Sequence, residues 1–285
     1  MAACSPQGSA ASIRGSLLPT PPDGWLLAVN HKPRKRFGQH FLHDPRVIAR
    51  IVAAIDPRPH DVLVEIGPGL GALTAPLLER VARLHVVEID RELAERLRAA
   101  YPAERLVVHT GDALEFDFAA LPAPLRVVGN LPYNISTPLL FRIAAFAPRL
   151  RDLHFMLQRE VVDRMVAAPS TPDYGRLSVM LQYRFEMAKL LDVGSGAFRP
   201  PPRVDSAIVR LVPRPAAALG ASDAEALARV VSTAFTKRRK TLRNALGGVI
   251  DEAGLRALGI DPRLRPENLG VEEYVRIANA ISRVG

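Results

Sequence analysis

Short runs of aliphatic and β-branched residues alternate with helical patterns between residues 62 and 130, and this alternation limits the possible folds more than any other feature of the chain. The expected elements, in chain order, are strand 62–66, helix 72–82, strand 84–89, helix 91–100, strand 106–108 and strand 126–128. Strands joined by helices form parallel sheets, because each crossover returns the chain to the same end of the sheet. We therefore predict an α/β fold with a Rossmann-like sheet.

The chain changes character after residue 213. Residues 213–222 form a connector rich in proline and alanine, and the pattern that follows is helical to the end. Ser222, with Glu225 three residues later, is typical of a capping box at a helix start. The first thirty residues are rich in serine and proline and show neither helical nor strand periodicity. We therefore expect three parts: a disordered leader over 1–30, an α/β domain over 31–213 and a small all-helical domain over 214–285.

The chain is strongly basic. Thirty-eight Lys and Arg residues against 29 Asp and Glu residues leave a net charge of +9. Two clusters hold a large part of the excess, and their members are Lys32, Arg34, Lys35 and Arg36 in the first and Lys237, Arg238, Arg239, Lys240 and Arg243 in the second. Such density favours contact with the phosphates of a nucleic acid, although a charged run can also be a solvated helix face.

The chain has one cysteine, Cys4, so we expect no intramolecular disulfide, no cysteine metal site and no thiol nucleophile. This usage fits a reducing compartment such as the cytoplasm. We also expect no metal site built from histidines, since no supporting ligands accompany them. No run approaches the roughly 20 apolar residues of a membrane helix, which predicts a soluble chain without a membrane partner.

A glycine-rich turn follows the first expected strand, where Gly67, Gly69 and Gly71 precede a helix. Glycines at such a turn let the backbone approach a nucleotide closely, with a helix N-terminus facing the ligand. Glu88 comes 21 residues after Gly67, at the end of the next strand, where a carboxylate can hold a ribose diol. Both dinucleotide enzymes and S-adenosylmethionine enzymes use this arrangement, and the turn also satisfies the dinucleotide fingerprint.

The ends of the next two strands separate these two classes. Asp112 follows the third strand, where its carboxylate could accept a hydrogen bond from an adenine amino group. The fourth strand ends in Asn130-Leu131-Pro132-Tyr133, for which a dehydrogenase has no use. Taken singly, Asp112 could cap a helix and the tetrapeptide could be a turn. Together, the glycine turn after the first strand and the polar groups at the next three strand ends favour an S-adenosylmethionine-dependent methyltransferase.

The tetrapeptide suits methylation of an adenine amino group. This nitrogen is a poor nucleophile, because its lone pair is conjugated into the ring. The side-chain oxygen of Asn130 and the carbonyl of Leu131 can accept its two N–H bonds and stabilise the charge that develops on attack. Pro132 restricts the backbone, and Tyr133 offers a ring on which a flipped base can stack. Phe198, in a proline-rich loop, is either a second wall for that base or a core residue.

Seven motifs together carry a family resemblance: RFGQHFL (36–42), EIGPGLG (65–71), EID (88–90), GD (111–112), NLPYNIS (130–136), FRPPPRVDS (198–206) and FTKRRKTLRN (235–244). Between residues 31 and 285 the chain closely resembles the bacterial small-subunit ribosomal RNA adenine dimethyltransferases. The resemblance implies four methyl transfers from S-adenosylmethionine, two to each of two adjacent adenines near the 3′ end of 16S rRNA. It also implies action on the assembling 30S subunit, in the cytoplasm, and we expect a monomer.

The resemblance also assigns the donor site. By motif, the residues that would bind S-adenosylmethionine are His40, Leu42, Gly67, Glu88, Asp112 and Asn130. The chain departs from the family at His40, where the usual residue is asparagine. An imidazole can still donate and accept hydrogen bonds, so donor binding is expected to survive the change.

Two further interpretations remain open at this stage. The related 23S rRNA adenine methyltransferases share the sheet motifs, although the basic segment 237–244 and the long helical tail favour the small-subunit enzymes. Alternatively, the chain could serve chiefly as an RNA-binding assembly factor whose catalysis is dispensable.

Overall fold

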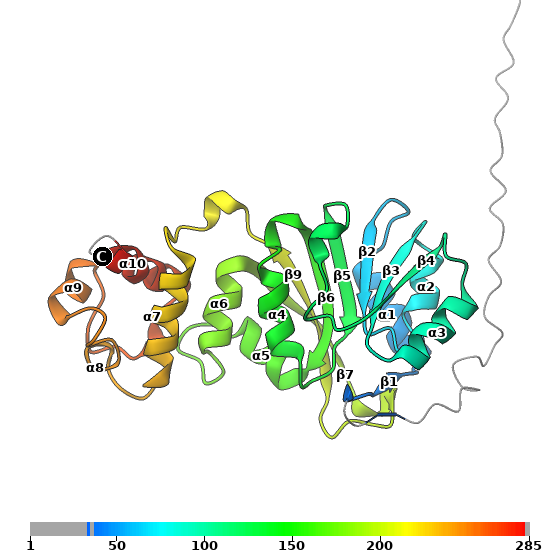
Figure 1. The fold of residues 1–285 in the computed structure, drawn as a ribbon. Coiled ribbons are helices and arrows are strands. Elements are labelled where there is room, and N and C mark those ends of the chain that lie inside the picture. Colours follow the sequence, from blue (N-terminus) through cyan, green and yellow to red (C-terminus); the bar gives the residue numbers. More distant parts are fainter. Residues whose placement is uncertain (1–32, 35–36, 283–285) are drawn as a thin grey trace, which may run out of the picture.

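A computed structural model describes residues 33–34 and 37–282, and its centre is a seven-stranded sheet (Figure 1). The strand order is β4-β3-β2-β5-β6-β9-β7. The strands are β2 (Val62–Ile66), β3 (Leu84–Glu88), β4 (Leu106–Thr110), β5 (Leu125–Asn130), β6 (Leu150–Gln158), β7 (Phe185–Val193) and β9 (Ser206–Pro213). The first five in this order are parallel, and β9 is antiparallel to both of its neighbours. The predicted Rossmann-like fold is confirmed.

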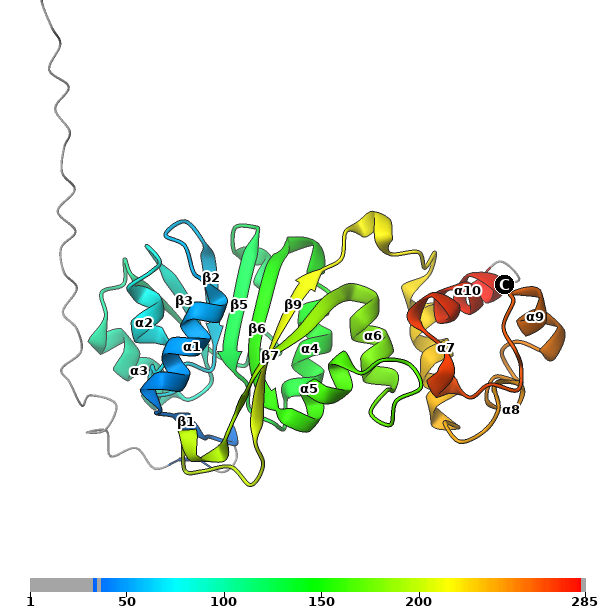
Figure 2. The same cartoon turned by 180° about the vertical axis from the view of Figure 1, so that it is seen from behind.

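Helices cover both faces of the sheet, as Figures 1 and 2 show from opposite sides. One face carries α1 (Pro45–Ile55), α2 (Thr74–Leu78) and α3 (Arg91–Ala100), and the other carries α4 (Ser136–Ala144), α5 (Arg159–Val166) and α6 (Arg176–Arg184). Each face has its own core of buried aliphatic and aromatic side chains. Neighbouring residues of each strand pack into different cores. In β2, Val64 packs on the α4 side and Leu63 on the α1 side. In β5, Val127 packs on the α4 side and Val128 on the α1 side.

The last helices form a separate cluster beyond α6, at one end of the molecule (Figure 1). They are α7 (Ala224–Thr236), α8 (Leu242–Ala245), α9 (Glu252–Ala257) and α10 (Val271–Ser282). Their shared core also takes in Tyr174, Val179 and Tyr183, from α6 and the loop before it. The expected capping box is wrong: Asp223 is the N-cap of α7, and both the backbone N–H and the hydroxyl of Ser222 donate to Asn279 instead.

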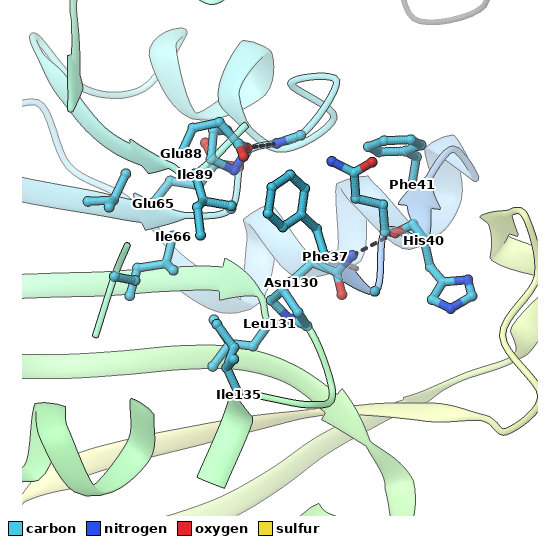
Figure 3. A pocket seen from close by; sticks show the side chains of 18 of the residues that line it. Phe37, His40, Phe41, Glu65, Ile66, Glu88, Ile89, Asn130, Leu131 and Ile135 are labelled. Atoms are coloured by element: carbon cyan, nitrogen blue, oxygen red, sulfur yellow. Dashed lines mark hydrogen bonds between the residues drawn. The ribbon is translucent and has the colours of Figure 1, made fainter. Parts of the chain in front are cut away.

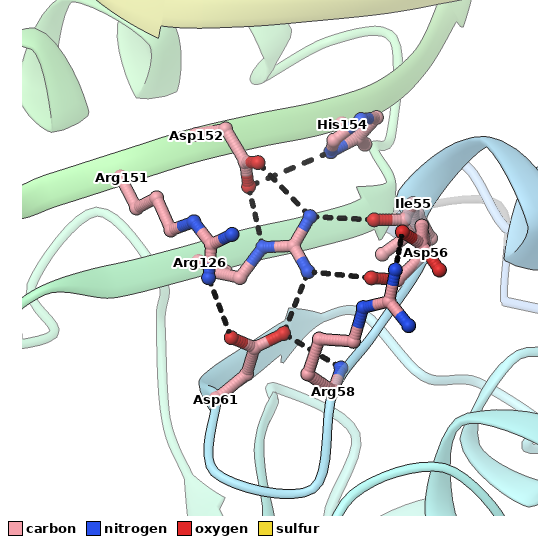
Figure 4. Close-up of polar contacts among 8 residues, drawn as sticks. All are labelled: Ile55, Asp56, Arg58, Asp61, Arg126, Arg151, Asp152 and His154. Carbon is pink, nitrogen blue, oxygen red and sulfur yellow. Dashed lines mark hydrogen bonds and ion pairs between the residues drawn. The ribbon is translucent and has the colours of Figure 1, made fainter.

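A buried charged network lies at the amino ends of β5 and β6 (Figure 4). The guanidinium of Arg126 pairs with Asp152 at 2.8 Å and with Asp61 at 2.7 Å, and it donates to the carbonyls of Ile55 and Asp56 at the end of α1. A buried arginine is costly unless all its donors are used, and here they join α1, β5 and β6. His154, on β6, is buried beside this network.

The strands β5 and β2 approach each other very closely near their carboxyl ends. Gly129 is paired with Ile66, and a Cβ atom at Gly129 would lie 2.4 Å from the Ile66 carbonyl oxygen. No other residue fits there without a shift of the backbone. The glycine turn after β2 and Asn130 at the end of β5 are thereby held next to each other.

Candidate active site

An open pocket lies at the carboxyl ends of β2, β3, β4 and β5. Parallel sheets bind ligands at this edge, and the sheet order reverses between β2 and β5, which is where such ligands usually lie. One wall comes from residues 37–42, which precede α1. Figure 3 shows residues of this wall facing those of the sheet edge. The other lining segments are 65–70, 72–73, 87–89, 111–113, 130–133 and residue 135.

The glycine turn has the backbone conformation that its sequence predicts. Gly67, Gly69 and Gly71 all have positive φ, at 65°, 58° and 83°, a region that side chains disfavour. The ring of Phe41 lies against this turn, since a Cβ atom at Gly69 would be 3.1 Å from its Cδ1. A nucleotide in the pocket therefore meets bare backbone on this side.

Glu88 is a buried carboxylate at the end of β3. Its Oε2 accepts a hydrogen bond from the Gly69 N–H at 3.1 Å, and its Oε1 accepts one from the Asp90 N–H at 2.8 Å. Burial raises the pKa of Glu88, while these hydrogen bonds lower it. The carboxylate is thus fixed in orientation at the pocket wall, in the position expected for a ribose-binding acid.

Glu65 is a second buried carboxylate in the lining, and it was not among the predicted site residues. It accepts a hydrogen bond from the Thr74 hydroxyl at 2.7 Å. Burial, together with the nearby charge of Glu88, raises its pKa to about 8, so the group is mainly protonated at neutral pH. The sequence feature that could have identified Glu65 as a site residue is its ionisable side chain within the otherwise apolar strand VLVEI.

The segment 130–133 joins the sheet edge to the opposite wall. The Asn130 side-chain amide donates to the His40 carbonyl at 3.0 Å. The imidazole Nδ1 of His40 lies 2.8 Å from the Pro200 carbonyl, and the His40 ring is stacked on Tyr133 with centroids 6.0 Å apart. The Tyr133 hydroxyl is 2.8 Å from the hydroxyl of Ser206. The aromatic ring expected to hold a base is therefore supported from two sides.

Nine of the ten predicted donor and base residues line this pocket: His40, Leu42, Gly67, Glu88, Asp112, Asn130, Leu131, Pro132 and Tyr133. Asp112 also accepts a hydrogen bond from the Leu114 N–H, which closes a turn. Phe198 is placed elsewhere. It lies on β8 (Phe198–Arg199), which pairs with β1 (Phe41–Leu42), and its ring is 2% exposed within the core on the α1 side.

The predicted RNA-binding cations fall into three groups. Lys32, Lys35 and Arg36 lie outside the described residues. Lys237, Arg239 and Lys240 are exposed between α7 and α8. Arg243 is exposed on α8 itself, with its Nη1 3.9 Å from Glu252 Oε2. Arg34 and Arg238 are instead engaged within the protein, Arg34 with Asp90 and Glu92, and Arg238 with Glu267 and the Pro172 carbonyl.

Two features are lacking over residues 33–34 and 37–282. No three side chains of His, Cys, Asp or Glu are grouped there so that they could hold a metal ion. In this same part of the chain, no helix has the length and apolar character needed to cross a membrane.

Curated relatives cover nearly the whole chain. The ribosomal RNA small subunit methyltransferase A of Chromobacterium violaceum is 61% identical over 256 residues, which is 90% of this chain and 98% of the relative. The protein of the same name from Aromatoleum aromaticum is 64% identical over 252 residues, or 88% of this chain and 95% of the relative.

Solved structures give the same fold. A dimethyladenosine transferase from Plasmodium falciparum superimposes with a TM-score of 0.75 at 24% identity, over 86% of this chain and 98% of that one. The 23S rRNA methyltransferase ErmE superimposes with a TM-score of 0.67 at 29% identity, over 85% and 99%. The model of the family described as ribosomal RNA adenine dimethylase matches residues 30–283. The chain therefore belongs to the ribosomal RNA adenine dimethylase family.

Proposed function

We propose that this protein transfers methyl groups from S-adenosylmethionine to the N6 atoms of two adjacent adenines near the 3′ end of 16S rRNA, and that it dimethylates each of them. The observation that carries the proposal is the position of Asn130, which lies at a strand end between the nucleotide pocket and a supported tyrosine ring. Relatives at 61–64% identity named as small-subunit methyltransferases favour this substrate over 23S rRNA.

The pocket fits an S-adenosyl donor. The buried Glu88 carboxylate can accept both hydroxyls of a ribose, and Asp112 lies at the neighbouring strand end, where an adenine amino group can donate to it. The positive-φ glycines leave space for the rest of the donor near the backbone. When bound, S-adenosylmethionine supplies an activated methyl group on sulfur, so positioning and electrostatics are the main tasks of the protein.

The residues on the other side of the pocket can position the adenine and stabilise the charge that develops on its amino group. Because the Asn130 amide N–H group is bonded to the His40 carbonyl, its side-chain oxygen is directed away from that bond and can accept from the adenine amino group. The Leu131 carbonyl can accept the second N–H. The adenine can stack on Tyr133, whose ring is held by His40 and Ser206. These contacts favour a nitrogen with its lone pair free for attack.

RNA binding is assigned to the exposed cations Lys237, Arg239, Lys240 and Arg243, on a separate helical domain over 214–285. We place the reaction on the assembling 30S subunit in the cytoplasm. We also propose a monomer, because one chain supplies every residue that this account of the site uses.

The test is incubation of the purified protein and labelled S-adenosylmethionine with 30S particles from a strain that lacks this methylation. Nucleoside analysis should then show dimethyladenosine in 16S rRNA. Particles that already carry the modification, and 50S subunits, serve as controls and should take up no label. Labelling of 23S rRNA would identify the alternative substrate, and growth rescue by an inactive Asn130 variant would favour the assembly role.

A further inference from the structure

Arg34 is tied to the start of α3 by two ion pairs. Its Nη1 lies 3.0 Å from Asp90 Oδ1, and its Nη2 lies 3.2 Å from Glu92 Oε2. The Asp90 side chain is fully buried, whereas that of Arg34 is about a third exposed. A buried carboxylate needs a partner of opposite charge, and Arg34 supplies one from 56 residues away in the chain.

A second contact joins the same two regions. The Gln39 side-chain amide donates to Asp90 Oδ2 at 3.2 Å, and its oxygen accepts a hydrogen bond from the Arg34 backbone N–H at 2.7 Å. Gln39 therefore holds the backbone of Arg34 while both side chains reach Asp90. We call Arg34 together with residues 37–42 the entry segment.

Asp90 also leads directly to the donor pocket. Its backbone N–H donates to Glu88 Oε1 at 2.8 Å, and Glu88 Oε2 accepts from Gly69. A continuous series of hydrogen bonds thus runs from the entry segment through Asp90 and Glu88 to the glycine turn. The entry segment also packs on that turn through Phe41 and lines the pocket with Phe37 (Figure 3).

We infer that Asp90 and Arg34 are positioning residues for the methyl donor, which hold the entry segment as a wall of its pocket, and that Arg34 serves donor binding rather than RNA binding. The Arg34 fork matches this task, because one nitrogen reaches Asp90 and the other reaches Glu92. The inference rests on the proposed use of an S-adenosyl donor.

The test compares Arg34→Ala with Arg91→Ala in the full chain. Arg91 is the neighbouring exposed arginine, and its side chain makes no hydrogen bond or ion pair with any residue that the structure describes. Titration calorimetry with S-adenosylhomocysteine should give a Kd raised roughly tenfold for Arg34→Ala, equivalent to about 1.4 kcal/mol, and an unchanged Kd for Arg91→Ala. Arg34→Lys should give an intermediate Kd, since a single ammonium does not span both carboxylates.

Kinetics provide a second readout. The Arg34→Ala variant should raise KM for S-adenosylmethionine while kcat at saturating donor and binding to a 16S rRNA fragment stay within about twofold of wild type. An unchanged Kd for S-adenosylhomocysteine, with weaker RNA binding and a salt slope lowered by about 1, would overturn the inference and return Arg34 to the RNA-binding cations. Failure of the wild-type protein to bind S-adenosylhomocysteine would instead count against the proposed function.

Discussion

The side-chain amide of Asn130 is hydrogen-bonded to the backbone carbonyl of His40, at 3.0 Å, across 90 residues of chain. This bond fixes which end of the amide faces the entry segment, and its oxygen is left for another donor. The structure uses the backbone of residue 40 for this contact, and the imidazole bonds to Pro200 instead.

Replacement of Asn130 by alanine should abolish most of the catalysis. We expect kcat to fall about 10²- to 10³-fold, as for loss of one preorganised polar contact to the reacting group. The Kd for S-adenosylhomocysteine should rise by less than about tenfold, because only one neutral hydrogen bond to the entry segment is lost. Single-turnover methylation of 30S particles and calorimetry measure the two quantities.

The matched control for this variant is Asn134→Ala, in the same loop. Asn134 is exposed and does not line the pocket, so its replacement should leave kcat within about twofold of wild type. Equal losses in the two variants would show that the loop, and not the Asn130 amide, limits the reaction.

Glu65 should make the protein less stable as pH rises. Its pKa is about 8 in the folded protein against 4.5 for the free group, so the folded state binds one more proton between these values. Its stabilising contribution is complete below pH 4.5 and is lost as pH rises through 8. The Glu65→Gln variant has no titrating group at this position, so its free energy of unfolding should not show this loss. Between pH 5 and pH 8, the unfolding free energy of wild type should therefore fall relative to that of the variant by on the order of 3 kcal/mol. Urea unfolding at several pH values tests this, with the exposed Glu79→Gln as control.

His154 should act in the opposite direction at acid pH. Burial, together with the nearby Arg126 and Arg210, lowers its pKa to about 4 from 6.5, although Asp152 opposes this shift. The folded state therefore binds fewer protons than the unfolded state between these values, and stability is lost as pH falls from 6.5 toward 4. The loss at pH 5 should be on the order of 2 kcal/mol. The His154→Leu variant should lose this part of the acid sensitivity. The control variant His60→Leu, at an exposed histidine, should keep it.

The cations between α7 and α8 should differ in what they do. Arg239 is exposed, so Arg239→Ala should weaken binding to a 16S rRNA fragment and lower the slope of log K against log salt by roughly 0.7 to 0.9. Arg238 is paired with Glu267 and with the Pro172 carbonyl, so Arg238→Ala should lower thermal stability and leave that slope nearly unchanged. Identical salt slopes for wild type and Arg239→Ala would remove Arg239 from the RNA surface.

The strands β2 and β3 could be predicted closely, because most of their residues are buried between the two layers of helices and their apolar runs end within a residue of the strand ends. The bounds of α3 were also correct, since Asp90 caps it and its apolar face is regular. The boundary between α6 and β7 could not be predicted from the sequence pattern. Leu181 of α6 packs in the core of the sheet while Val179 packs in the core of the last helices, so α6 lacks a single apolar stripe.

The lining of the site was predictable where chemistry fixed the residue type, as at Gly67 and Glu88. The partners of charged side chains were not, because they depend on tertiary contacts. The charge of Arg34 was evident from the sequence, but its partner Asp90 belongs to a different element. Likewise Phe198 follows no pattern that shows burial, and the pairing of β8 with β1 decides where its ring lies.

The tight fit at Gly129 has a consequence for any attempt to alter this enzyme. The glycine turn follows Ile66, and Asn130 follows Gly129, on two paired strands with no space for a side chain at Gly129. The spacing between the two substrates is therefore set by the main chain rather than by side chains. Variation of side chains can retune the outer walls, such as the entry segment or the ring of Tyr133. A methyl donor or base that needs a longer separation would require a different sheet register, which point substitutions do not provide.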